Sequence, residues 1–196
     1  MQCEFIIIRH GTTKANKEKR YAGRSDYPLL DEGRAELLSR DYSAFGDVQL
    51  VFSSPLLRCL QTADIVFPGK EKIIIQDFIE CNFGDFEDKN YIEMADDPAY
   101  QAWVDSGGTL PFPNGEDIEE FKDRCALAMK KVIDICNEKG LQRAGLAVHG
   151  GVIMSVMERL CTQKKKYYEW QPENGCGYIC LSNGSYDLDL IKEIKF

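Results

Sequence analysis

Short apolar runs alternate along the chain with longer stretches in which apolar residues recur at helical spacing. An apolar run that ends in glycine or polar residues indicates a buried strand, whereas apolar positions repeating every three and four residues indicate a helix. The pattern therefore predicts strands at 3–9, 48–52, 72–76, 144–148, 178–181 and 186–191. Asn183-Gly184 lies between the last two strands and predicts a hairpin there.

Helices are predicted between these strands. Asp31 is expected to cap a helix that runs to about Phe45. Ser54 is expected to cap the next helix, with Pro55 at its first position, and Pro68 ends it. The remaining helices are predicted at about 117–139 and 152–161, with short helical pieces near 91–94 and 98–104.

Strands that alternate with helices predict an α/β fold. We expect a three-layer sandwich, in which a mostly parallel central sheet carries helices on both faces. The length suits one domain over residues 1–196, with a small helical cap-like insertion at about 81–114.

The chain contains two histidines, and each follows a predicted strand and precedes glycine. His10 stands between Arg9 and Gly11, and His149 is followed by Gly150 and Gly151. In open α/β sheets, ligands bind at the carboxyl ends of the strands. We therefore expect both imidazoles at the same edge of the sheet.

Residues 9–16 read Arg-His-Gly-Thr-Thr-Lys-Ala-Asn, which resembles the R-H-G-x-T-x-x-N signature of the histidine phosphatase superfamily, also called phosphoglycerate mutase-like. Further segments resemble the family in the same order along nearly the whole chain. These are a second arginine segment at 53–63, an acid-bearing loop from Glu80 to Glu87, Pro-Asn-Gly-Glu at 113–116, and His-Gly-Gly at 149–151.

The resemblance implies a phosphomonoesterase that forms a phosphohistidine on His10. A neutral imidazole is a good nucleophile near pH 7, since its ordinary pKa is roughly 6.5. Glu80 is the candidate general acid, because desolvation by neighbouring apolar residues would raise its pKa. Asp85, Glu87 and Asp88 lie close in sequence and remain alternatives.

Several other residues are expected to bind the phosphoryl oxygens. Arg9 and Arg58 supply planar, permanently charged donors, with Arg58 in the first turns of the helix that Ser54 is expected to cap. His149 adds a third donor if the phosphoryl charge protonates it. Asn16 donates its amide, Gly150 lets the backbone approach the anion, and Gly23 is a candidate substrate contact. Glu116 matches a family motif, but a favourable position at a helix N-terminus is enough to explain it.

Composition limits the partners and the compartment. A formal charge of −8 argues against broad binding to nucleic acid or anionic membrane, and no apolar run is long enough to cross a bilayer. We expect a cytoplasmic protein whose eight cysteines are reduced thiols, because Met1 leads directly into a strand pattern without a signal peptide. No metal and no other cofactor are expected, since the histidines lack ligand spacing to any cysteine pair.

Sequence features also favour one branch of the family. Lys89 is the only basic residue between Glu80 and Lys122, so the paired arginines that mutases use on a carboxylate are missing, which favours hydrolysis. The blocks at 83–87 and 170–178, together with Trp103, resemble the α-ribazole phosphatase branch, which acts on α-ribazole 5′-phosphate in cobalamin nucleotide loop assembly.

Alternatives remain at this stage. They are a broad-specificity small-molecule phosphatase, a phosphoglycerate mutase-like enzyme, and a non-catalytic phosphate-binding module on the same fold. Tyr91, Tyr100 and Trp103 either stack on a substrate base or form the apolar side of the cap helices. Whether the protein forms a homodimer is left open.

Overall fold

A six-stranded sheet forms the centre of the computed structural model, which describes residues 2–196, and its strand order is β3-β2-β4-β1-β5-β6. The strands are β1 (Cys3–Arg9), β2 (Leu50–Ser53), β3 (Lys72–Ile74), β4 (Arg143–Val148), β5 (Gly177–Ser182) and β6 (Asp189–Ile194). The strands β1 to β4 run parallel to one another, and β5 is antiparallel to both β1 and β6. The sheet is thus mixed, and the predicted hairpin forms its last two strands.

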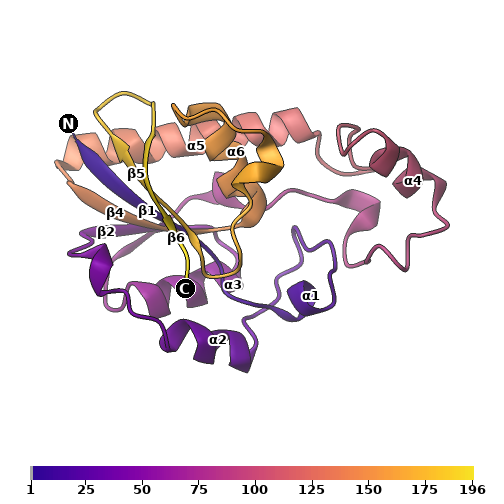
Figure 1. Ribbon diagram of the computed structural model, residues 1–196, viewed down its shortest axis with the longest axis horizontal. Coiled ribbons are helices and arrows are strands. Elements are labelled where there is room, and N and C mark those ends of the chain that lie inside the picture. The colour runs from indigo at the N-terminus through magenta and orange to yellow at the C-terminus, as the bar shows by residue number, and fades with distance from the viewer. Residues whose placement is uncertain (1) are drawn as a thin grey trace.

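Helices cover both faces of the sheet (Figure 1). One face carries α5 (Ile118–Lys139) and α6 (Gly150–Leu160), and the other carries α2 (Asp31–Leu38) and α3 (Leu57–Val66). Alternate residues of β1 divide between the two cores: Phe5 and Ile7 pack in the core of α5 and α6, and Ile6 and Ile8 pack in the other. A central strand buried on both faces has to be apolar throughout, which is why its sequence is a continuous run. The three-layer α/β prediction is confirmed.

The longest helix begins and ends as its sequence predicts. The side chain of Asp117 accepts hydrogen bonds from the amides of Glu119 and Glu120, which caps the N-terminus of α5. Gly140 ends the helix in the left-handed region, with φ of 67°, where glycine is the favoured residue.

Two helix boundaries differ from the prediction. α2 ends at Leu38 instead of continuing to Phe45, because the Tyr42 hydroxyl donates to the carbonyl of Leu37 and residues 43–45 form a separate 3-10 helix. Asp31 is its first residue and not its cap, which is Leu30. α3 begins at Leu57 with Leu56 as its N-cap, so the prediction that Ser54 caps this helix is wrong.

Residues 81–114 contain one α-helix, α4 (Pro98–Asp105), and the 3-10 helix Gly84–Phe86. The helical piece predicted near 98–104 is confirmed, whereas 91–94 forms turns, because the Asn90 side chain accepts hydrogen bonds from the backbone amides of Ile92 and Glu93. Aromatic side chains pack together in this segment and join the core of α5 and α6. The cluster comprises Tyr21, Phe83, Phe86, Tyr100, Trp103 and Phe112.

Candidate active site

The two histidines lie side by side at the carboxyl ends of neighbouring strands. β1 and β4 pair in parallel with Arg9 opposite Val148, and the His10 amide donates to the carbonyl of Val148 at 2.9 Å. The two imidazole centroids are 5.3 Å apart in an edge-to-face arrangement. The sheet topology therefore brings both rings to one edge, as the strand pattern predicts.

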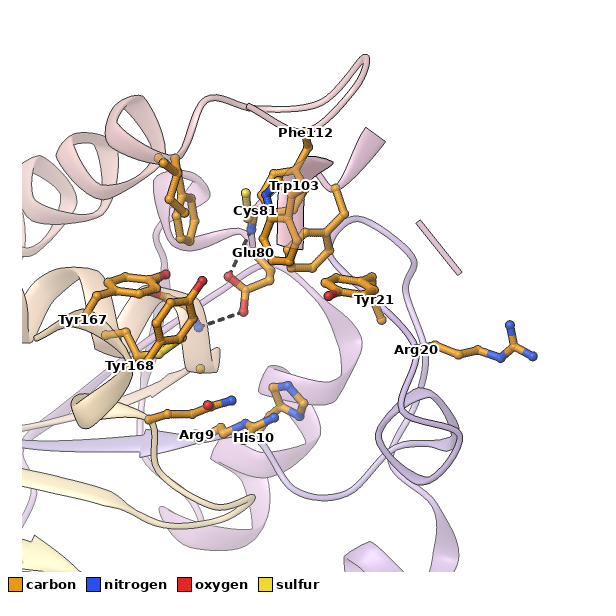
Figure 2. Close-up of a pocket in the computed structure, with 18 residues that line it drawn as sticks. Arg9, His10, Arg20, Tyr21, Glu80, Cys81, Trp103, Phe112, Tyr167 and Tyr168 are labelled. Carbon is orange, nitrogen blue, oxygen red and sulfur yellow. Dashed lines mark hydrogen bonds between the residues drawn. The ribbon is translucent and has the colours of Figure 1, made fainter. Parts of the chain in front are cut away.

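A cavity of about 280 Å³ opens at this edge. Figure 2 shows Arg9 and His10 at one side of the cavity and Glu80 facing them from the other, with aromatic side chains around. Arg20 also lines the cavity, but its side chain is directed away from His10 and binds Glu93 through both terminal nitrogens.

His10 is buried as a neutral imidazole. Its Nδ1 lies 2.8 Å from the carbonyl oxygen of Gly11. A carbonyl only accepts, so Nδ1 carries the proton and Nε2 keeps its lone pair. Burial lowers the pKa of His10 well below its ordinary value, and the charges of Arg58 and Arg9 lower it further. The ring is therefore uncharged at neutral pH, as a nucleophile requires.

Arg9 has an unsatisfied donor at the cavity. One terminal nitrogen donates to the carbonyl of Pro172 at 2.8 Å, while its buried Nε has no hydrogen-bond partner among residues 2–196. A buried guanidinium N–H without a partner is costly. The free Nε–H of Arg9 lies beside His10, where it could donate to a bound anion.

Arg58 holds a loop against the site. Its side chain is fully buried, and its terminal nitrogens donate to the backbone carbonyls of Ser25 at 2.8 Å and Gly23 at 3.0 Å. Its Nε donates to Nδ1 of His149 at 3.3 Å. Arg58 does not belong to the described residues that line the cavity. From outside the cavity, its side chain connects residues 22–25 to His149.

His149 has partners on both ring nitrogens. Nε2 lies 2.7 Å from the Ser54 hydroxyl, and Nδ1 accepts from Arg58. Burial and the adjacent Arg58 lower the pKa of His149 well below its ordinary value. The ring is thus neutral in this arrangement, with both nitrogens occupied. The charged third donor that the sequence predicts depends on protonation by a phosphoryl group and stays a prediction.

Glu80 is a buried carboxyl that two backbone amides hold. Oε1 accepts from Cys81 and Oε2 from Gly151, each at 3.0 Å (Figure 2). Burial raises the pKa of Glu80, and these hydrogen bonds oppose that shift only in part. A Cβ atom at Gly151 would stand 2.4 Å from Oε1. The second glycine of His-Gly-Gly therefore makes room for the acid.

The neighbouring acids have other partners. Asp85 accepts from the Asn114 amide, Glu87 from the backbone of Gly23 and Ser25, and Asp88 from two hydroxyl groups. Among the described residues, Glu80 is the only carboxylic acid that lines the cavity. The alternatives that the sequence leaves open are thereby placed outside it.

Asn16 and Gly23 lie near the site in supporting positions. The Asn16 side-chain oxygen accepts from the Thr13 amide at 3.0 Å and the Asn174 amide at 3.2 Å. Its NH₂ group donates to no other group among residues 2–196. Gly23 packs so close to the Cys81 carbonyl that an added Cβ would stand 1.7 Å from its oxygen.

Sequence reasoning missed several supporting residues. Thr62 accepts from the Gly11 amide at 3.0 Å, and Asn174 donates to the His10 carbonyl at 3.0 Å. Ser54 supports His149 as described above. All three lie inside the segments that resemble the family, at 53–63 and 170–178. The polar side chains in these segments were the signal in the sequence that could have identified these three residues.

The family model of the histidine phosphatase superfamily (branch 1) matches residues 5–187, and the chain belongs to this superfamily. Phosphoglycerate mutase-like protein 4 of Arabidopsis thaliana is 32% identical over 171 residues, which cover 83% of this chain and 73% of the relative. Adenosylcobalamin/alpha-ribazole phosphatase of Salmonella typhimurium is 26% identical over 176 residues, covering 87% and 86%. The crystal structure of alpha-ribazole phosphatase from Shigella flexneri matches with a TM-score of 0.82 at 22% identity, covering 100% and 96% of the two chains, which shows a shared fold.

Three further observations concern the rest of the molecule. Within residues 2–196, none of the helices has the length and apolar character needed to cross a membrane. The eight cysteines are buried and free. In the same residues, no three side chains of His, Cys, Asp or Glu are grouped to hold a metal ion.

Proposed function

We propose that the protein is a phosphomonoester hydrolase that acts through a phosphohistidine on His10. The observation that carries the proposal is a neutral imidazole with a free Nε2 across one cavity from a buried carboxyl with a raised pKa. The lowered pKa of His10 favours a neutral nucleophile, and the raised pKa of Glu80 favours the protonated form that an acid needs.

The reaction takes two steps. Nε2 of His10 attacks phosphorus, the ester P–O bond breaks, and Glu80 gives its proton to the leaving oxygen. Water then attacks the phosphorus of the phosphohistidine and gives a proton to the Glu80 carboxylate. The P–N bond breaks, which returns the electron pair to Nε2 of His10, restores the acid and releases phosphate. Arg9 stabilises the charge on the phosphoryl oxygens, and we propose that Asn16 and Gly150 lie near these oxygens. For Arg58 and His149 to donate as well, the phosphoryl group has to replace the carbonyl partners of Arg58 and to protonate His149. The side chains supply the positive charge, so we propose that no metal is required.

The composition of the cavity supports a substrate with an apolar or aromatic alcohol portion. Its lining includes Tyr21, Phe83, Trp103, Phe112, Phe121, Tyr167 and Tyr168. Arg20, the cation beyond Arg9, is already paired with Glu93 and Glu18. A second acidic group on the substrate, as in a phosphoglycerate, would find no free cation among the described residues of this lining. This supports hydrolysis over mutase activity.

Within this class we propose α-ribazole 5′-phosphate as the substrate. Its benzimidazole ring suits the aromatic lining, and relatives of this chain carry the name alpha-ribazole phosphatase. We propose that residues 81–114 act as the cap that supplies part of that lining. A broad-specificity phosphatase is the second candidate, since aromatic walls accept many apolar groups.

The central test is covalent trapping on His10. Rapid quench with phosphate-labelled substrate should recover acid-labile label on the wild-type protein and none on His10→Ala, which should also lose turnover of p-nitrophenyl phosphate by orders of magnitude. EDTA should leave the wild-type rate unchanged. Label on another residue, or near-normal turnover by His10→Ala, would refute the mechanism, and a wild-type protein without turnover would favour a phosphate-binding module.

A further inference from the structure

The candidate acid lies in a segment without regular secondary structure. Residues 79–83, between two 3-10 helices, belong to no helix or strand. The Glu80 carboxyl is held by the amide of Cys81 within the same segment and by Gly151 of α6. Its position therefore depends on whatever fixes the backbone of residues 77–82, which we call the acid segment.

Arg124 fixes the part of the acid segment that precedes Glu80. This residue lies in the second turn of α5, the longest helix. One of its terminal nitrogens donates to two backbone carbonyls, that of Asp77 at 2.6 Å and that of Ile79 at 3.0 Å. A rigid helix thereby holds the chain immediately before the acid.

Glu116 fixes the part that follows. Its Oε2 accepts from the Asn82 amide at 3.1 Å, and its own amide donates to the Asn82 carbonyl at 2.8 Å. The same carboxylate receives two nitrogens of Arg124, Nε at 2.8 Å and a terminal nitrogen at 2.9 Å. This bidentate geometry is the strong form of the ion pair, and it joins the two attachments into one unit.

Gly115, the residue before Glu116 in the Pro-Asn-Gly-Glu segment, makes the contact between Glu116 and Asn82 possible. A Cβ atom at Gly115 would stand 2.5 Å from the Asn82 carbonyl oxygen, so only glycine lets the backbones meet here. The expectation that Glu116 acts as an acid at a helix N-terminus is replaced, because Asp117 caps α5 and Glu116 is committed to Arg124 and Asn82.

We propose that Arg124 and Glu116 are positioning residues that hold Glu80 in line with the leaving oxygen. Neither belongs to the described residues that line the cavity, so they act through Glu80 and not on the substrate. The inference rests on the proposed function, in which Glu80 donates the proton.

The test compares leaving groups. Arg124→Ala should lower kcat for an alkyl phosphate by roughly 10- to 100-fold, because an acid displaced by about 1 Å loses that much. It should lower kcat for p-nitrophenyl phosphate only a few-fold, since that leaving group scarcely needs a proton. In a Glu80→Gln background, Arg124→Ala should cause no further loss with the alkyl ester. Arg159→Ala is the matched control, because Arg159 pairs with Glu119 and Asp123 away from the acid segment.

Two measurements keep the proposal testable whatever the stability of Arg124→Ala. Glu116→Gln preserves the side-chain volume and should show the same dependence on leaving group. Amide hydrogen exchange at Cys81 and Asn82 should be faster in both variants than in wild type, whether or not the protein turns over phosphate. Equal losses for both esters, additive losses with Glu80→Gln, or unchanged exchange would overturn the proposal. A wild-type protein without turnover refutes the proposed function alone, and the exchange rates still decide on the positioning pair.

Discussion

Burial acts in opposite directions on the pKa values of the two residues proposed for chemistry. Burial disfavours the charged form of each group. It therefore lowers the pKa of His10, whose charged form is the imidazolium, and raises the pKa of Glu80, whose charged form is the carboxylate. Both groups are thereby driven toward neutrality. A neutral imidazole can attack and a neutral carboxyl can donate, so one physical cause prepares both partners.

These shifts predict the pH profile. As pH falls through the lowered pKa of His10, the nucleophile becomes protonated and kcat/KM drops. As pH rises through the raised pKa of Glu80, the acid loses its proton and kcat/KM for an alkyl phosphate drops. Glu80→Gln should lose roughly 10²–10⁴-fold with this ester and should lack the basic limb. A basic limb that persists in Glu80→Gln would assign it to another group.

At the scale of elements, the end of β2 supports the end of β4. The Ser54 hydroxyl follows β2 and accepts only a long bond of 3.4 Å from the Leu56 amide, whereas it lies 2.7 Å from Nε2 of His149. Ser54, whose sequence position is typical of a helix cap, instead contacts the imidazole of His149 at the end of the neighbouring strand. Burial decides this, because a ring N–H without water must find a protein acceptor.

A double-mutant cycle tests the contact between Ser54 and His149. Ser54→Ala leaves the buried His149 N–H without its partner and should reduce the free energy of unfolding by about 1–3 kcal/mol. In a His149→Gln background the same substitution should cost less, because the imidazole is gone. Urea unfolding of the four proteins measures this, and an identical cost in both backgrounds would mean that Ser54 contributes to stability independently of His149.

At the scale of the whole molecule, two regions distant in sequence build the cavity. The sheet edge provides Arg9 and His10, and the 81–114 segment provides Trp103 and Phe112 on the side of the cavity where Glu80 lies (Figure 2). The sequence named Tyr91, Tyr100 and Trp103 as candidates for stacking. Tyr91 is 50% exposed, Tyr100 is 8% exposed within the core, and only Trp103 of the three lines the cavity.

Trp103 should therefore affect substrate choice. Trp103→Ala removes a large aromatic surface and should lower kcat/KM for α-ribazole 5′-phosphate by roughly tenfold or more, by analogy with pocket contacts worth 1–3 kcal/mol. Its effect on glycerol phosphate should be small, because that alcohol does not reach the ring. Tyr91→Ala is the control and should change neither value. A similar loss on both esters would indicate that Trp103 supports the fold and does not select the substrate.

Local patterns in the sequence were sufficient for the elements that depend on local physics. The apolar run of β1, the spacing and caps of α5, and the glycines after both histidines each express a preference that acts within a few residues. Parallel strands share an edge, so the meeting of His10 and His149 also followed from the pattern. The antiparallel pairing of β5 with β1 could not be predicted from local patterns, because strand order depends on pairing between distant segments.

Only the tertiary structure decided which of several similar residues does what. The sequence named Glu80 as the candidate acid and left Asp85, Glu87 and Asp88 as alternatives. Burial of Glu80 against Gly151, 71 residues away, distinguishes it from them. Ser54 meets His149 across 95 residues. A hydrogen bond between distant segments leaves no periodic trace in the chain, and desolvation depends on everything packed around a group. The kinds of residue were therefore readable from sequence, whereas their partners and their pKa values came from the fold.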